Sequence, residues 1–230
     1  MKSVLYIIFI ILFCFNCSFA QQNKITDQIQ EALSLIQAQQ LGEAETLLRK
    51  LQLAAPDNVD VYNLLGIVLD QKGLTADAEK QFRTAITVNP KAVSPRANLG
   101  VLLAKISRKT EAIQVFETVI NLAPNHPEAP INLGFLYNTT GNYTKALEYL
   151  KKADAIRPKN YGIIFNLGIA LYNTNLLDDA SRDFEAAAAL SSTSAEPFYW
   201  LGMIAFNREQ NDAPPDKGLP KKVSRPQKNK

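Results

Sequence analysis

The sequence predicts an all-α fold, a stack of antiparallel helical hairpins made from one repeating unit. Prolines recur at a constant interval, Leu-Gly pairs recur in step with them, and each repeat has two stretches with apolar residues three and four positions apart. The prolines are Pro56, Pro90, Pro124 and Pro158. A fixed period of about 34 residues is typical of helix–turn–helix repeats, which stack into extended binding surfaces.

Each repeat is predicted to hold two amphipathic helices, the second ending before the recurring proline, which cannot continue a helix. The first helices are expected over 59–72, 93–106, 127–140 and 161–174, and the second over 75–88, 109–122, 143–156 and 177–190. A degenerate unit precedes them and a lone closing helix, 195–208, follows. The predicted solenoid, 21–207, therefore has five hairpins, with units at about 25–58, 59–92, 93–126, 127–160 and 161–194.

Three columns of residues explain how such a hairpin would pack. They are Gly66, Gly100, Gly134 and Gly168; Ala78, Ala112, Ala146 and Ala180; and Phe82, Phe116, Leu150 and Phe184. Glycine inside a helix costs about 1 kcal/mol relative to alanine, so its repeated use indicates a close approach by a neighbour. We expect the alanine column to face the glycines and the large side chains to fill the space around them.

These columns resemble the tetratricopeptide repeat family, and the resemblance covers about residues 25–208. The tryptophan that this family carries near the start of each unit is replaced by Tyr62, Arg96, Pro130 and Ile164. The resemblance implies a right-handed superhelix whose concave side binds peptides or proteins, without catalysis. It also suggests that the first helices face inward. Basic residues for clamping a carboxylate are scarce on that face, where Lys105 stands alone.

The two ends of the chain have different compositions from the body. Lys2, an apolar run over 4–15 and Ser18-Phe19-Ala20 predict a signal peptide over 1–20 that is cleaved after Ala20. A retained anchor and lipidation at Cys17 remain alternatives. From Arg208 onward the sequence has seven basic and three acidic residues, many prolines and few large apolar residues, so 208–230 is predicted to be a disordered basic tail.

Catalytic and metal-binding chemistry finds little support in the sequence. The only histidine, His126, stands in a predicted turn, and both cysteines, Cys14 and Cys17, lie in the predicted signal segment. Each glycine belongs to a helix column or a turn, so no phosphate-binding loop is expected. We therefore expect no catalytic residue, no metal site, no cofactor and no enzymatic activity.

Two features of the first helices point to a partner-binding surface. Asn98, Asn132 and Asn166 form a ladder, each directly before its Leu-Gly pair, and an amide can pair with a peptide bond whatever side chain it carries. The C-terminal half adds apolar and aromatic residues on the same face. The predicted partner-binding residues are Asn63, Asn98, Asn132, Asn166, Phe135, Phe165, Tyr172 and Tyr199. Alternatively, the amides bond neighbouring helices or water, and part of the apolar set is packing between helices.

The favoured interpretation is an exported, non-catalytic adaptor or scaffold, periplasmic, outer-envelope or secreted, which binds a protein or peptide on its concave face. The alternative is a structural component of an envelope assembly that self-associates or contacts the membrane through its basic tail. We expect no nucleic-acid partner, because the predicted signal peptide directs the chain out of the cell.

Overall fold

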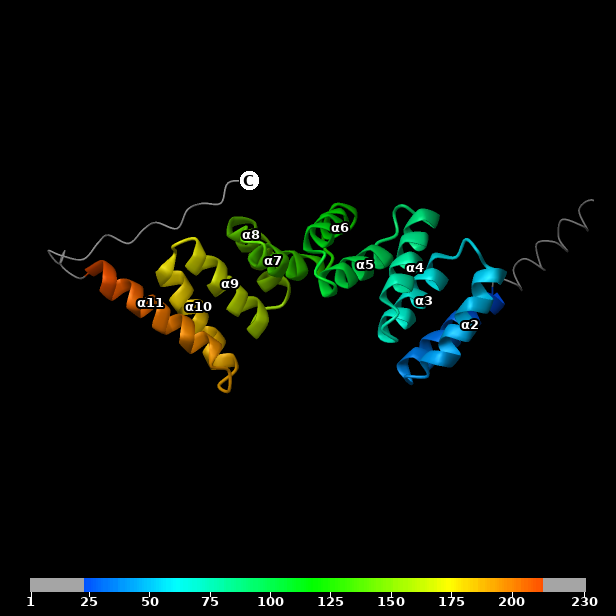
Figure 1. The fold of residues 1–230 in the computed structure, drawn as a ribbon, viewed down its shortest axis with the longest axis horizontal. Coiled ribbons are helices and arrows are strands. Elements are labelled where there is room, and N and C mark those ends of the chain that lie inside the picture. The colour runs from blue at the N-terminus through cyan, green and yellow to red at the C-terminus, as the bar shows by residue number, and fades with distance from the viewer. Residues whose placement is uncertain (1–22, 213–230) are drawn as a thin grey trace, which may run out of the picture. The chain divides into compact units, whose positions relative to one another are not determined.

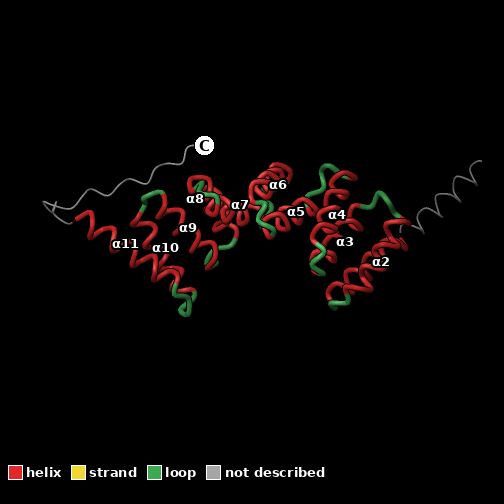
Figure 2. The backbone as a smooth tube through the Cα atoms, viewed as in Figure 1, coloured by secondary structure: helices red, strands yellow, loops and turns green. Residues whose placement is uncertain are grey.

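The computed structural model describes residues 23–212, and these residues form helices joined by short loops (Figure 2). Residues 1–22 and 213–230 lie outside the described residues, and so do the predicted signal peptide and most of the predicted tail. A helix over 23–37 is followed by α2 (Leu41–Ala54), α3 (Val59–Gln71), α4 (Thr75–Val88), α5 (Ser94–Lys105), α6 (Lys109–Leu122), α7 (Ala129–Thr139), α8 (Tyr143–Ile156), α9 (Tyr161–Asn173), α10 (Leu177–Leu190) and α11 (Glu196–Asp212).

The chain divides into two compact units, Met1–Ala153 and Asp154–Lys230, with the boundary inside α8. In the first unit α3 packs on α4, α5 on α6, and each second helix also contacts the next first helix. In the second unit α9 packs on α10, and α10 contacts α11 (Figure 1). Each unit is therefore built from antiparallel hairpins, as the repeat predicts.

The second helices of the four clear repeats have the predicted bounds, whereas α5 and α7 begin one and two residues later than predicted. The reason is a proline in the first turn of each, Pro95 in α5 and Pro130 in α7. A proline is tolerated there because the first N–H groups of a helix have no intrahelical partner.

The glycine column lies under the large side chains of the third column, which corrects the expected pairing with alanine. A Cβ added at Gly66, Gly100 or Gly168 would come within 2.5–2.8 Å of a phenylalanine ring, and one at Gly134 within 2.5 Å of Leu150. The third column stands one turn after the alanines on the same face of the second helix, and its longer side chains reach across. The alanines are fully buried nonetheless.

Polar side chains close the N-termini of three first helices. The Asn58 side chain accepts hydrogen bonds from the backbone N–H groups of Asp60 and Val61, and Asn160 caps α9 in the same way. His126 Nδ1 accepts from the N–H groups of Glu128 and Ala129 at 3.3 and 3.2 Å, at the start of α7. These groups satisfy donors that the helix itself leaves unpaired.

The closing helix continues beyond its predicted end. We expected it to stop at 208, where the basic tail would begin, but α11 runs to Asp212. Arg208 lies within this helix, and its guanidinium donates to the Asp178 carboxylate of α10 at 2.5 Å. Arg208 was predicted both to end the closing helix and to begin the tail, and it is therefore bonded to the preceding helix instead.

Candidate partner-binding surfaces

The first asparagines of the predicted set contact each other. Asn98 of α5 donates its side-chain N–H to the Asn63 carbonyl oxygen of α3 at 2.8 Å. Asn63 is buried and Asn98 is half-buried. The two residues come from successive repeats, so the contact joins consecutive first helices. For this pair, the amides therefore bond neighbouring helices, which was the alternative to ligand binding. Asn98 still has a second N–H and a carbonyl oxygen with which to meet a ligand.

The remaining two asparagines bond within their own helices. Asn132 donates to the backbone carbonyl of Glu128 at 2.9 Å, and Asn166 donates to that of Gly162 at 2.8 Å. Both are half-buried, so part of each side chain reaches the surface. Asn132 belongs to the first unit and Asn166 to the second. The asparagines that share one column thus differ in their bonding.

The two faces predicted for α7 differ in burial. Leu133, Gly134 and Tyr137 are buried on the hairpin side, whereas Ile131 and Phe135 of the opposite side are half-buried. Phe135 is the only aromatic residue of the predicted binding set in the first unit. It is partly accessible and partly packed, so the structure leaves it available as a contact residue.

An aromatic cluster connects the three helices of the second unit. Phe165 of α9 stacks on Tyr161 with ring centroids 5.6 Å apart and meets Phe184 of α10 edge-on at 5.7 Å. Trp200 of α11 stacks on Phe184 at 5.7 Å and meets Tyr172 edge-on at 5.0 Å. Aromatic pairs in these geometries add stability beyond the area that they bury. These contacts therefore hold the rings of the cluster in place.

A hollow of about 480 Å³ opens beside this cluster, lined by Phe165, Ile169, Ala195, Glu196, Tyr199 and Trp200. Tyr199 is 63% exposed, although it contacts Trp200 edge-on at 5.8 Å. Glu196 is the one charged residue in the lining. Its carboxylate accepts a hydrogen bond from the Tyr161 hydroxyl at 3.2 Å, and that hydroxyl also lies 2.7 Å from Ser194 Oγ.

Sequence reasoning missed Trp200, and it also missed Ala195 and Glu196 of the same lining. Trp200 is the only tryptophan of the chain, and it stands one repeat period after Asn166, directly before Leu201-Gly202. Following the asparagine column one step further would have found it. Of the predicted binding residues, the hollow brings together Phe165 and Tyr199. Tyr172 of α9 lies against Trp200 of α11, and the Tyr172 hydroxyl accepts a hydrogen bond from Asn207 at 2.7 Å.

A polar cluster in the first unit has a structural role. The Tyr137 hydroxyl donates to Glu117 at 2.5 Å, and Lys145 donates to both groups. The hydrogen bond from Tyr137, supported by Lys145, lowers the pKa of Glu117. Burial, together with the adjacent Glu117 carboxylate, raises the pKa of the Tyr137 hydroxyl. Tyr137 also stacks on Tyr149 at 5.7 Å, so this cluster joins α6, α7 and α8.

Within residues 23–212, no helix is both long and apolar enough to cross a membrane. No group of three or more His, Cys, Asp or Glu side chains in that same stretch could hold a metal ion.

Family models of the tetratricopeptide repeat match the chain over 29–93, 69–130 and 97–161, and a second such model matches 139–190. The chain belongs to the tetratricopeptide repeat family. Tetratricopeptide repeats serve in general as protein–protein interaction modules without catalysis of their own. No curated protein matches the sequence.

Solved structures with the same fold share little sequence with this tetratricopeptide repeat chain. PilF of Pseudomonas aeruginosa is 20% identical, with a TM-score of 0.70 over 84% of this chain and 88% of PilF. YrrB, described as having an unusual peptide-binding site, is 18% identical with a TM-score of 0.66 over 75% and 89%. PilW, a type IV pilus biogenesis factor, is 18% identical with a TM-score of 0.64 over 81% and 91%. At these identities the likeness establishes the helical repeat fold.

Proposed function

We propose that this tetratricopeptide repeat protein is an adaptor that holds a segment of a partner protein by placing a large apolar side chain in the aromatic hollow of its second unit. The observation that carries this proposal is the exposure of Tyr199, which is 63% accessible beside a stacked and partly buried Trp200. Partly exposed aromatic side chains on a rigid support are the residue types that dominate binding energy at protein interfaces.

The lining predicts the chemistry of the bound segment. Phe165, Ile169 and Trp200 offer apolar surface, which favours an aromatic or large aliphatic side chain. Glu196 adds one negative charge at the edge, so a lysine or arginine beside the apolar side chain would be preferred. Because Tyr161 already donates to Glu196, the carboxylate is held in place before the partner arrives.

The asparagines complete the proposal in a secondary role. Asn98, Asn132 and Asn166 are half-buried rather than buried, so part of each residue reaches the surface. An amide offers both a donor and an acceptor to a peptide backbone, and such contacts add affinity without demanding a particular sequence. YrrB, which shares the fold, is described as having a peptide-binding site and lends this role general support.

The proposal is tested by affinity capture from the host's envelope fraction with the full chain and its variants. Tyr199→Ala should weaken recovery of a specific partner about tenfold, because it removes an exposed aromatic anchor. Leu190→Ala is the control: Leu190 is 43% exposed in the same unit but does not line the hollow. Equal recovery by wild type and Tyr199→Ala would contradict the proposal.

A second variant separates the asparagines from the hollow. The triple change of Asn98, Asn132 and Asn166 to alanine should also reduce recovery while the protein stays folded. If the triple variant retains the partner and Tyr199→Ala loses it, the hollow binds without the asparagines. Folding of each variant is checked by its helical circular dichroism and its unfolding temperature.

We also place this adaptor in the cell envelope or outside the cell. The support is the signal-like start of the sequence, Lys2 followed by the apolar run and Ser18-Phe19-Ala20. PilW, which shares the fold, is described as a pilus biogenesis factor. Fractionation of the host, followed by N-terminal sequencing of the purified protein, tests this. An N-terminus at Gln21 in the envelope or medium is expected, and an uncleaved chain in the cytoplasm would contradict it.

A further inference from the structure

α11 is built like the first helix of a repeat, but no second helix follows it within the described part of the chain. Its Leu201-Gly202 pair stands one repeat period after Leu167-Gly168. A Cβ added at Gly168 would lie 2.7 Å from the Phe184 ring, whereas one at Gly202 would meet nothing within 4 Å. Among residues 23–212, therefore, nothing takes on α11 the place that α10 takes on α9.

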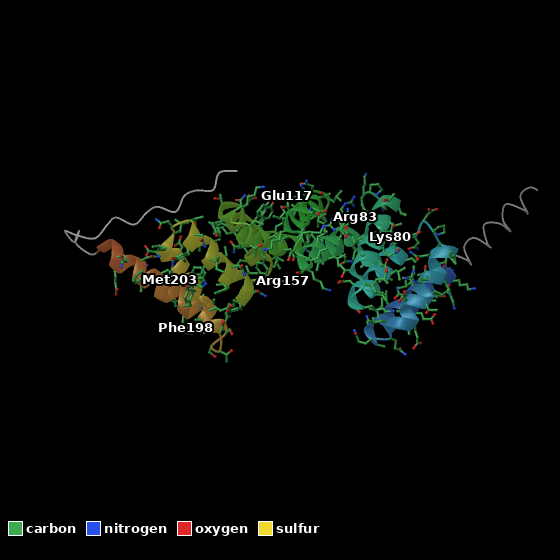
Figure 3. All side chains as sticks on the ribbon, viewed as in Figure 1. Lys80, Arg83, Glu117, Arg157, Phe198 and Met203 are labelled. Atoms are coloured by element: carbon green, nitrogen blue, oxygen red, sulfur yellow. The ribbon has the colours of Figure 1, made fainter. Side chains whose placement is uncertain are left out.

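An exposed apolar strip surrounds Gly202. Residues three and four positions away on either side share its face of the helix. These are Phe198, Tyr199, Ala205 and Phe206, and all four are exposed, Phe198 by 57% and Phe206 by 49%. Their counterparts on α9, one repeat period earlier, are all half-buried or buried. Figure 3 shows Phe198 and Met203 on α11.

The repeat defines what fits on this strip. In each clear repeat the glycine is covered by a second helix that carries an alanine and, four residues later, a phenylalanine or leucine. The glycine admits the large side chain because it has no Cβ of its own. A helix with this Ala-x-x-x-Phe or Ala-x-x-x-Leu spacing is therefore the shape that the open strip of α11 accepts.

The chain itself has no spare helix of this kind among its described residues. The large side chain of every second helix is already buried against its own hairpin, with exposures of 2% or less at Leu48, Phe82, Phe116, Leu150 and Phe184. Continuing the register past α11 places Pro214 at the alanine position and Gly218 at the phenylalanine position. Neither the described second helices of another copy nor the sequence register after 212 therefore provides the missing pair of side chains.

We propose that the strip around Gly202 binds an α-helix from a different protein, which packs as the missing second helix and seats a phenylalanine or leucine on Gly202. This surface is distinct from the hollow, although Tyr199 borders both. The hollow receives a single apolar side chain beside Glu196, whereas the strip receives one face of a helix. The burial of an apolar face that is now exposed to water favours the complex.

The test uses a synthetic helix that copies α10, because α10 already performs this role on α9. The probe is residues 175–192, held helical by a hydrocarbon staple between positions 182 and 186, which are exposed in α10. Binding to the full chain is measured by the anisotropy of a fluorescent label on the probe. We expect saturable binding, and at least tenfold weaker binding to Gly202→Leu, whose added side chain fills the space that Phe184 of the probe would enter.

Two controls make the test specific. Gly42→Leu is matched to Gly202→Leu, because Gly42 is also a helical glycine with nothing within 4 Å of an added Cβ, and this variant should bind as the wild type does. A probe in which Phe184 is replaced by alanine should bind at least tenfold more weakly to the wild type. Absence of saturable binding, or equal binding by the Gly202→Leu variant, would overturn the proposal.

Two further outcomes would assign the strip to another occupant and so overturn it. If the probe binds only after residues 213–230 are removed, the chain's own C-terminal residues occupy the strip. If the full chain self-associates in sedimentation, and Gly202→Leu abolishes this, a second copy occupies it. Failure of the proposed hollow is separable: Ile169→Ala changes the lining of the hollow without changing the strip and should weaken only the capture, whereas Gly202→Leu leaves the hollow's lining residues unchanged.

Discussion

The two units share one repeat but join consecutive first helices by different chemistry. In the first unit Asn98 bonds Asn63, and Lys105 pairs with Asp70 at 2.8 Å, both between α3 and α5. In the second unit Tyr172 packs against Trp200 and accepts a hydrogen bond from Asn207. The hairpin contacts, a glycine under a phenylalanine or leucine, are the same in both. The repeat thus fixes the hairpin and leaves the contacts between repeats free to differ.

This difference has a consequence for binding. Polar contacts between repeats in the first unit use part of the hydrogen-bonding capacity of Asn98 and Lys105, so less of that capacity remains for a partner. Aromatic contacts in the second unit leave ring faces and edges accessible beside the hollow, as Tyr199 and Trp200 show. We therefore expect partner recognition to depend more on the second unit, and stability against acid to depend more on the first.

The largest expected effect is on the aromatic cluster. Phe184→Ala should destabilise the protein by about 3–5 kcal/mol, because it removes a buried ring that packs on Gly168 and stacks on Trp200. Thermal unfolding followed by circular dichroism measures the effect. Phe198→Ala makes the same chemical change at a 57% exposed site and should cost far less. Equal losses would mean that the ring stack does not hold the second unit together.

The glycine column should give the next largest effect. Gly134→Leu places a side chain where Leu150 lies 2.5 Å from an added Cβ, so we expect a loss of about 1–3 kcal/mol or more from overpacking. Asn132→Leu, two residues away on the half-buried face, should change the unfolding midpoint little. If both variants unfold at the same temperature, the assignment of the two faces of α7 is wrong.

The polar contact between repeats should contribute less. A double-mutant cycle with Asn63→Ala and Asn98→Ala should give a coupling energy of about 0.5–1.5 kcal/mol in urea unfolding. A parallel cycle in the second unit, with Tyr172→Phe and Asn207→Ala, removes the hydrogen bond between α9 and α11 while keeping the ring of Tyr172. A coupling near zero for Asn63 and Asn98 would show that their hydrogen bond does not help to hold α3 and α5 together.

The smallest expected effect is the acid dependence of the first unit. Because the pKa of Glu117 is lowered below its usual 4.5 in the folded protein, its contribution is present above about pH 4.5 and is lost as the pH falls through the folded value. Glu117→Gln should therefore be less stable than the wild type at about pH 6, and the gap should narrow towards about pH 3. A gap that is constant with pH would show that the Glu117 charge plays no part.

Much of the fold followed from the sequence, because helix periodicity and proline spacing are local. The bounds of α4, α6, α8 and α10 agree with the predicted ranges, and the glycines do mark a close approach. The pairing across the hairpin was less accessible. The glycines contact the phenylalanine and leucine column rather than the alanine column. The sequence alone does not show how far a side chain extends from one helix to the next.

The candidate site was predicted only in part. Phe165 and Tyr199 do come together at the hollow, but Trp200 was missed because it replaces the asparagine that marks its column in the preceding repeats. The caps supplied by Asn58, Asn160 and His126 were also missed, although a polar residue just before a predicted helix start is a recognised signal.

The sequence by itself determined the hairpin and the number of repeats, because a fixed repeat period sets which side chains share a face of each helix. Tertiary structure alone decided which of those side chains bond one another. Asn98 donates to Asn63 of the preceding repeat, whereas Asn132, which stands in the same column, donates to a backbone carbonyl of its own helix. The physical reason is that a hydrogen bond depends on small differences in distance between neighbouring helices, and sequence spacing does not set those distances.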